Sequence, residues 1–328
     1  MTPSAFKSSL ASLALAVLLS ACGGQSQDKA PTSAASDGLD ARIITIATGG
    51  ASGPYNIIGT TLADVYHNLY GVNAKTQTTG ASIENMNLLA QGKAELALVM
   101  SDVVTESING SENFPNKITN VQQIAAIYPN YVQVVSNANS NISSIDDLRG
   151  KRVAVGDQNS GTEFNARRLL NGHGITYQDI KVDYLGFAEA ADALKAGKVD
   201  AVFITSGMPN ASIMELERGF NLKIVPINPD KIKEIAQDQA YFVSLIIPKG
   251  TYGNAEDIPT AAIMNALMIR ADLSEEDGYK LTKGFFENLP QLVNAHQAAK
   301  DIALDKAQDG VVAPLHPGAQ KYYAEQGL

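Results

Sequence analysis

Short apolar runs alternate with amphipathic segments in the first third of the chain. Residues 43–48 form an apolar run that ends in two glycines, which predicts a buried strand. A helix is expected over residues 54–70, because Pro54 suits a first helical turn. The pattern then predicts strand, helix and strand in turn over residues 72–78, 82–91 and 96–100. This order is typical of a parallel sheet with helices on its faces.

The same order recurs further along the chain. It predicts strand, helix, strand, helix and strand over residues 152–155, 160–171, 181–185, 188–196 and 199–205. Residues 89–95 and 194–200 also match in sequence, although helix–Gly–Lys–strand joints of this kind are common in α/β proteins. The recurrence predicts two sheets of similar construction.

Extended segments lie between and after these two units. Residues 124–127 and 131–136 are strand-like, and residues 241–247 form another extended run. We expect the last two of these to cross between two domains. Helices are expected over residues 259–270 and 274–288, packing back onto the first domain.

Length and composition agree with two folded domains. The chain has 328 residues, of which 45% are hydrophobic, too many for a disordered protein. We expect residues 42–130 and 245–328 to form domain I, and residues 131–244 to form domain II. The net charge of −9 argues against nucleic acid as a partner. The single cysteine excludes an internal disulfide framework and a cysteine-based zinc cluster, and we expect neither a metal nor a cofactor.

The N-terminal segment resembles a bacterial lipoprotein signal. Lys7 precedes an apolar stretch too short to span a bilayer, and small residues lead directly to Cys22. We expect residues 1–21 to be removed and Cys22 to carry the lipid that attaches the protein to a bilayer. Residues 22–41 then read as a flexible tether. The alternative is a plain signal peptide with an incidental cysteine. Both predict an extracytoplasmic protein, in the periplasm or at the cell surface.

Candidate ligand contacts gather in the loops that follow the predicted strands. In parallel sheets, ligands bind at the carboxyl ends of strands, where loops lead into helices. Glycines let backbone N–H groups approach a ligand, and helix starts add positive dipole ends, so two facing helix N-termini form a site for a carboxylate. Tyr55 and Asn85 would add a hydroxyl and an amide. The loops are 49–55, 79–85, 156–163 and 186–189. Helix capping and ligand contact stay equally open for Ser52, Ser82, Ser160 and Thr162.

Enzyme motifs find little support in the sequence. The glycines of residues 49–53 lack the dinucleotide-binding spacing, and no G-K-[ST] loop or G-x-S-x-G elbow occurs. The four histidines are scattered and form no H-x-x-x-H pair. Glu163 and Asp102 are interpreted as surface or loop carboxylates. We therefore expect a protein that is not an enzyme and has no catalytic residues.

Several short motifs follow one another in a recognisable order. They are Thr48-Gly49-Gly50-x-x-Gly53-x-Tyr55, Thr79-Gly80-x-Ser82-x-Glu84-Asn85, Leu96-Ala97-Leu98-Val99-x-Ser101-Asp102, Tyr128-Pro129, Ser160-Gly161-Thr162-Glu163-x-x-Ala166-Arg167, Gly197-x-x-Asp200-Ala201 and His316-Pro317-Gly318-Ala319-x-x-Tyr322-Tyr323. Each is weak alone. Together, over residues 43–326, they resemble the TAXI family of solute-binding proteins, which are partners of TRAP (tripartite ATP-independent periplasmic) transporters.

The resemblance implies an α/β, two-domain fold of the type II periplasmic-binding-protein kind, with two parallel-core sheets flanked by helices and a ligand cleft between them. It also implies binding of a small anionic solute, with glutamate, related amino acids and dicarboxylates as candidates, and delivery to TRAP permease subunits driven by an ion gradient. Asn56 and Asn130 depart from the tyrosine and the acid that the family often has. The ligand-binding residues carried over are Gly50, Ser52, Gly53, Tyr55, Thr79, Ser82, Asn85, Ser101, Ser160, Gly161, Thr162 and Ser206.

The sequence thus leads to the hypothesis of a solute-binding lipoprotein that closes around its ligand by a hinge. A binding protein of the same fold that serves an ATP-driven importer is the nearest alternative. An enzyme on this scaffold is a second alternative. A structural lipoprotein without a ligand is a third, and the glycine-rich loops argue against it because such loops reduce stability.

Overall fold

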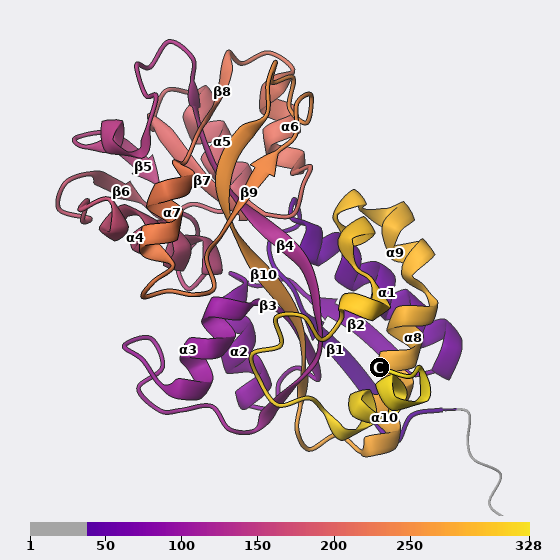
Figure 1. The fold of residues 1–328 in the computed structure, drawn as a ribbon. Helices are drawn as coiled ribbons and strands as arrows, with labels where there is room; N and C mark the ends of the chain where they lie inside the picture. Colours follow the sequence, from indigo (N-terminus) through magenta and orange to yellow (C-terminus); the bar gives the residue numbers. More distant parts are fainter. Residues whose placement is uncertain (1–37) are drawn as a thin grey trace, which may run out of the picture. The chain divides into compact units, whose positions relative to one another are not determined.

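Ten strands form one continuous mixed sheet in the computed structural model, which describes residues 38–328 (Figure 1). The strand order is β2-β1-β3-β10-β4-β7-β5-β6, with β8 beside β4 and β9 beside β10. The strands are β1 Ile43–Ala47, β2 Asn73–Gln77, β3 Leu96–Met100, β4 Val121–Asn137, β5 Arg152–Ala154, β6 Lys181–Asp183, β7 Ala201–Ser206, β8 Leu222–Val225, β9 Val243–Ile247 and β10 Ile258–Arg270.

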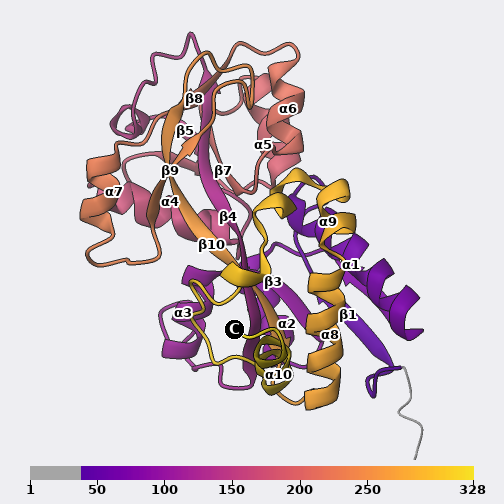
Figure 2. The ribbon, with the colours of Figure 1, turned by 45° about the vertical axis from the view of Figure 1, so that its right-hand side comes forward.

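Helices cover both faces of this sheet in two lobes (Figures 1 and 2). Lobe I holds β1 to β3 with α1 Pro54–Tyr70, α2 Ser82–Ala90, α3 Ser101–Asn109, α8 Glu275–Glu287, α9 Leu289–Ala295 and α10 Pro317–Glu325. Lobe II holds β5 to β9 with α4 Gly161–Gly172, α5 Phe187–Lys195, α6 Ala211–Glu217 and α7 Pro229–Ile235. Short 3₁₀ helices lie at Ile145–Leu148, Gln297–Asp301 and Leu304–Lys306. The expected α/β fold with parallel strand pairs at each end is confirmed, and the two expected sheets are joined into one.

Two long antiparallel strands, β4 and β10, run through both lobes and join them. β4 pairs with β10 along its first part and with β7 and β8 of lobe II along its second part. The segments expected at 124–127 and 131–136 are therefore one strand that continues through Pro129. Proline has no N–H to donate to a neighbouring strand, and the register between β4 and β10 shifts beside it, between Met264 and Ala266.

The helix expected over residues 259–270 is wrong, because these residues form β10. Alanine, leucine and methionine favour helices, but β10 is paired on one edge with β3 and β9 and on the other with β4. Most of its side chains are buried on both faces of the sheet, so the sequence lacks the alternation that marks a half-exposed strand. The crossing between lobes expected for residues 241–247 is also wrong. These residues include β9, which pairs with β10 within lobe II, and β10 itself runs from one lobe to the other.

Four apolar clusters fill the space between sheet and helices, two in each lobe. In lobe I, α1 and α8 to α10 pack on one face, and α2 and α3 on the other. In lobe II, α4 and α7 pack on one face, and α5 and α6 on the other. Ile247, Tyr252, Ala261 and Ile263 belong to the lobe II clusters. The division into domains stays a prediction, and this packing favours a second boundary within β10 rather than after residue 244.

The predicted signal peptide, the lipid-bearing Cys22 and most of the predicted tether lie outside the described residues. Where the description begins, the N–H groups of Asp40 and Ala41 donate to the Asp277 carboxylate at 2.7 and 2.9 Å. None of the helices within residues 38–328 has the length and apolarity that a bilayer span requires.

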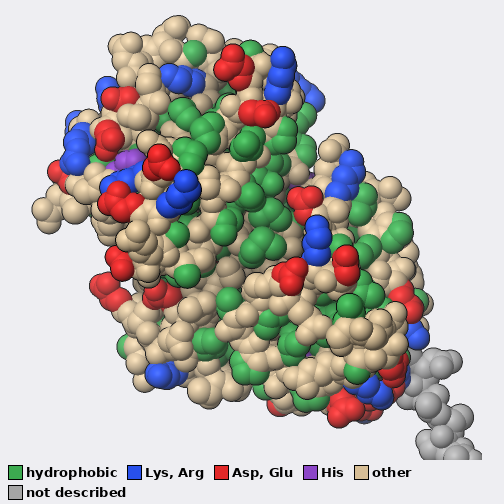
Figure 3. All heavy atoms as spheres, viewed as in Figure 1, with side chains coloured by type: hydrophobic (Ala, Val, Ile, Leu, Met, Phe, Trp, Pro, Cys, Tyr) green, Lys and Arg blue, Asp and Glu red, His purple; other side chains and the backbone are tan. Residues whose placement is uncertain are grey.

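Charged side chains are mixed on the face of the molecule seen in Figure 3, where basic and acidic groups alternate and no basic patch forms. Hydrophobic side chains gather there over β9 and the neighbouring strands. Val243 and Ile246 of β9 are 40% and 51% exposed. This face therefore lacks the basic surface that a nucleic acid backbone requires.

Candidate ligand-binding site

A cavity of about 70 Å³ lies between the two lobes, at the carboxyl ends of the parallel strands. Lobe I contributes the loops after β1, β2 and β3, and lobe II contributes the loops before α4 and α5 and the end of β7. Asn130 lies in the crossing strand β4. The lining residues are Gly49, Gly50, Gly53, Pro54, Tyr55, Thr79, Gly80, Ala81, Met100, Asn130, Asp157, Ser160, Thr162, Gly186, Phe187, Thr205 and Ser206.

Five helices begin at this cavity, because the N-cap residue of each one lines it. The first N–H groups of a helix have no partner within the helix and carry a partial positive charge. The positive ends of five helix dipoles therefore lie at a cavity whose wall carries no cationic side chain. The five N-cap residues are Gly53 of α1, Ala81 of α2, Met100 of α3, Ser160 of α4 and Gly186 of α5.

Close contact between the lobes depends on glycines beside the cavity. A Cβ atom on Gly161 would lie 2.9 Å from Met100 Cε and 2.9 Å from Ser82 Oγ, both in lobe I. A Cβ atom on Gly80 of lobe I would lie 3.0 Å from the Gln158 carbonyl oxygen of lobe II. A larger residue at either position would force these neighbouring atoms of the opposite lobe to shift.

Tyr55 connects the cavity wall to the crossing strands. Its hydroxyl donates to Asn265 Oδ1 in β10, and the Asn265 amide donates to the Tyr128 carbonyl at 2.8 Å. Burial raises the pKa of Tyr55 well above its usual range, and polar interactions with the Ser82 and Asn130 side chains oppose this only in part, so the phenol stays protonated.

The structure brings together seven of the twelve residues that the sequence suggested as ligand contacts. These seven line the cavity: Gly50, Gly53, Tyr55, Thr79, Ser160, Thr162 and Ser206. Ser160 also caps α4, because its hydroxyl accepts the Glu163 N–H at 3.0 Å. The Ser206 hydroxyl donates to the Gly207 carbonyl at 3.1 Å and accepts from Gln133 and Asn210.

The other five do not line the cavity: Ser52, Ser82, Asn85, Ser101 and Gly161. The Asn85 amide is held within the protein, since Nδ2 donates to the carbonyls of Thr48 at 2.6 Å and Leu98 at 2.8 Å. Its Oδ1 accepts the Thr79 hydroxyl at 2.6 Å. Asn85 therefore fixes the loop after β2 against β1 and β3. Ser82 accepts the Met100 N–H at 3.1 Å, which joins the starts of α2 and α3.

Two cavity residues that the sequence did not suggest have buried polar atoms without a partner. They are Asn130 Oδ1 and Thr205 Oγ1, in side chains that are 3% and 1% exposed. A buried polar atom without a hydrogen bond reduces stability. The sequence offered a signal for each, since Asn130 departs from the resemblance and Thr205 directly precedes the suggested Ser206.

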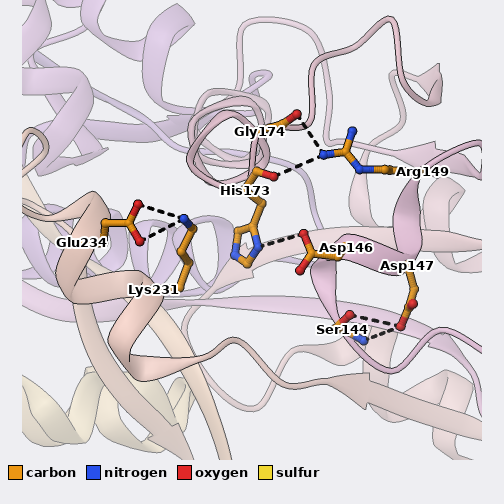
Figure 4. Close-up of polar contacts among 8 residues, drawn as sticks. All are labelled: Ser144, Asp146, Asp147, Arg149, His173, Gly174, Lys231 and Glu234. Atoms are coloured by element: carbon orange, nitrogen blue, oxygen red, sulfur yellow. Dashed lines mark hydrogen bonds and ion pairs between the residues drawn. The ribbon is translucent and has the colours of Figure 1, made fainter.

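Asp157 is the one acidic residue of the cavity wall, which has no lysine or arginine. Arg149, at the start of lobe II, lies elsewhere. Arg149 donates to the carbonyls of His173 at 3.4 Å and Gly174 at 3.0 Å, at the end of α4 remote from the cavity (Figure 4). The ring of His173 lies between Asp146 and Lys231 in the same cluster. Within residues 38–328, no group of three or more His, Cys, Asp or Glu side chains is placed to hold a metal ion.

Helices α3 and α4 meet across the cleft through two polar pairs. The Asn165 amide of α4 donates to the Asp102 carboxylate of α3, and both side chains are fully buried. One turn further, Arg168 and Glu106 form an ion pair at 2.5 Å. Burial raises the pKa of Asp102 to about 7, although Arg168 opposes this shift. Glu163 instead pairs with Arg167 at 2.9 Å. The interpretation of Asp102 and Glu163 as surface or loop carboxylates is therefore wrong, because both are buried and lie within helices.

Solved structures share this fold. A periplasmic transporter protein is 14% identical with a TM-score of 0.54, and 87% of this chain covers 95% of that one. A protein of Bordetella bronchiseptica RB50 is 17% identical with a TM-score of 0.53, over 88% of this chain and 83% of that one. The binding protein component of an ABC phosphonate transporter from Pseudomonas aeruginosa is 14% identical with a TM-score of 0.52, over 80% of both chains. Residues 46–327 match the NMT1-like family, and this chain belongs to that family.

Proposed function

We propose that this protein is an extracytoplasmic solute-binding protein that captures a small carboxylate-bearing solute between its lobes and delivers it to a membrane transporter. One observation carries the proposal. A cavity enclosed by residues of both lobes lies at the N-termini of five helices. Backbone N–H groups at helix starts stabilise a carboxylate without a cationic side chain.

Hinge closure follows from the way the lobes are joined. β4 and β10 run through both lobes, and the register shift beside Pro129 lies near the cavity residue Asn130. A solute that contacts both lobes only in the closed state would shift the population toward that state. The binding role is favoured over catalysis, because Asp102 and Glu163 are engaged within the protein and no serine or threonine hydroxyl of the cavity wall is hydrogen-bonded to a histidine or carboxylate side chain.

The resemblance to the TAXI family supports delivery to a TRAP permease driven by an ion gradient, with glutamate, related amino acids and dicarboxylates as ligand classes. The fold supports an ATP-driven importer equally well, because the Pseudomonas aeruginosa relative belongs to an ABC transporter. Neighbouring genes separate the two. A gene for a large polytopic permease without an ATPase gene favours the first transporter, and an adjacent ATPase gene favours the second. The proposed location is outside the cytoplasm, with attachment to a bilayer through lipid on Cys22.

A thermal-shift panel tests the proposed function. The purified protein is unfolded and refolded to remove any copurified solute, and is then heated with amino acids, dicarboxylates, short fatty acids and sugars. A solute at a hundred times its Kd adds about 2.7 kcal/mol of stability, which raises the melting temperature by several degrees. A shift with one carboxylate class supports the proposal. No shift with any solute after refolding contradicts it.

A further inference from the structure

The wall of the cavity between the lobes presents mostly carbon. Five of its side chains are apolar or aromatic, and most of the surface that the wall turns toward the cavity is apolar. Lobe I supplies Pro54, Tyr55, Ala81 and Met100, and lobe II supplies Phe187. A methionine side chain is flexible and polarisable, so Met100 can fit apolar groups of different shapes. The wall therefore suits a solute with an apolar part.

The polar side chains of the wall have their polar atoms engaged or covered. The hydroxyls of Thr79, Ser160, Thr162 and Ser206 each have a hydrogen-bond partner within the protein. Asn130 Oδ1 and Thr205 Oγ1 have no such partner, but both atoms are buried below the surface of the wall. Ligand pockets usually place a few free polar side-chain groups to fix the polar parts of a solute. The interior of this wall offers few of them.

The charged side chain of the wall lies at its rim. Asp157 is exposed to solvent, and its Oδ1 accepts the Gln158 N–H at 2.9 Å. For an anionic group, the wall instead offers backbone N–H groups at the helix starts, which can hold one carboxylate. A second ionised group would lose its water to lie against carbon, which is costly.

Phe187 reaches across the cleft between the lobes. It is the first residue of α5 and is partly buried, and its ring packs on the apolar cluster beneath α5 and α6. A Cβ atom on Gly53 would lie 3.4 Å from Phe187 Cε2 and 3.6 Å from Cδ2, so the ring lies against the backbone of lobe I. Phe187 is therefore placed to cover a solute when the lobes close.

We infer that the solute is a monocarboxylate with an apolar side chain, and that Phe187 packs on this side chain in the closed state. The helix starts hold the carboxylate, and removal of apolar surface from water stabilises the rest of the complex. This inference rests on the proposed solute-binding function and narrows it. It departs from the acidic solutes that the family resemblance implies.

Two pairs of solutes test the selection by thermal shift on the refolded protein. Leucine has an isopropyl group where aspartate has its side-chain carboxylate, and isocaproate differs from succinate in the same way. We expect a larger rise in melting temperature with the apolar member of each pair. An equal or larger rise with aspartate or succinate, or shifts confined to solutes without an apolar side chain, overturns the inference but leaves the solute-binding function standing. No shift with any solute overturns both.

Three variants test the role of the Phe187 ring. Phe187→Ala should weaken binding of the best apolar solute about tenfold, measured by calorimetry, because the solute loses its apolar contact with lobe II. Phe187→Leu keeps an apolar side chain and should keep most of the affinity. The matched control is Phe220→Ala, which removes another partly buried ring on the same cluster but outside the cavity wall. It should lower the melting temperature without changing affinity. Unchanged affinity in Phe187→Ala, or an equal loss in Phe187→Leu or Phe220→Ala, overturns the inference.

Discussion

Replacing Asp102 by asparagine should flatten the dependence of stability on pH near neutrality. Asp102 is fully buried opposite Asn165, whose Oδ1 has no hydrogen-bond partner. A protonated Asp102 can donate to that oxygen, and an asparagine at the same position can donate from its NH₂ group at every pH. The variant is nearly isosteric, so we expect it to fold. The other titratable groups that face residue 102 are Glu106, Arg168, Tyr55 and Tyr241.

The magnitude follows from the raised pKa. Burial raises the pKa of Asp102 from 3.8 to about 7 in the folded protein. Between these values the folded protein holds a proton that the unfolded chain has lost. Stability therefore falls as pH rises through this window and stays at the lower level above it. A shift of about three units corresponds to ~4 kcal/mol, of which about 2.5 kcal/mol develops between pH 5 and pH 8.

Urea unfolding followed by circular dichroism at pH 5 to 8 measures the effect. The stability of Asp102→Asn should rise relative to the wild type by about 2.5 kcal/mol over this range, or about 5 °C in melting temperature at about 2 °C per kcal/mol. The control is Asp64→Asn, at an exposed position of α1, which should follow the wild-type profile. Parallel profiles for the wild type and Asp102→Asn would refute the reasoning, because Asp102 would then titrate as an ordinary carboxylate.

Three further substitutions test the packing around the cavity. Gly161→Ala should prevent full closure of the lobes, because its Cβ would lie 2.9 Å from two lobe I atoms. Small-angle scattering should therefore give a larger radius of gyration for Gly161→Ala than for the control Gly219→Ala. The Cβ of that control would meet nothing within 4 Å. Ser160→Ala should reduce the free energy of unfolding by about 1 kcal/mol, measured in urea, because α4 loses its cap. Asn85→Ala should reduce it by about 3 kcal/mol, because the three hydrogen bonds of a fully buried side chain are lost; a loss below about 1 kcal/mol would contradict the structural role.

Local patterns predicted most of the elements in the first half of each lobe. Residues 43–48 end in glycines and are followed by Pro54, and the structure has β1 and then α1 at these positions. Such signals depend on a few neighbouring residues, so they can be read without knowing the fold. β10 could not be identified in this way, because its strand conformation is imposed by neighbours far away in the chain. Alanine, leucine and methionine make up six of its 13 residues, and pairing with β3 and β4 decides its state.

The candidate site was predictable in its loops but not in its key polar groups. Glycine and serine next to predicted strand ends pointed to Gly53, Tyr55 and Ser160, which line the cavity. Asn85 has the residue type of a ligand contact, and only the three-dimensional structure shows that its amide is fully used inside the protein. Threonine is common in strands, so the residue type alone did not single out Thr205. Only the three-dimensional structure shows that its buried hydroxyl has no hydrogen-bond partner.

Opening and closing of the two lobes should link ligand binding to protonation of Asp102. Met100 and Ser160, the N-caps of α3 and α4, line the cavity, and the Asp102–Asn165 pair joins the same two helices. Opening the cleft separates this pair and returns Asp102 to water, where its pKa falls toward the ordinary value. The closed state is then favoured at pH 6 over pH 8 by about tenfold, because one pKa unit corresponds to a tenfold change in the ratio of the two states. Between pH 6 and pH 8, the affinity for the best solute, measured by calorimetry, should weaken about tenfold in the wild type and stay constant in Asp102→Asn. A constant affinity in both proteins would mean that Asp102 stays buried when the cleft opens.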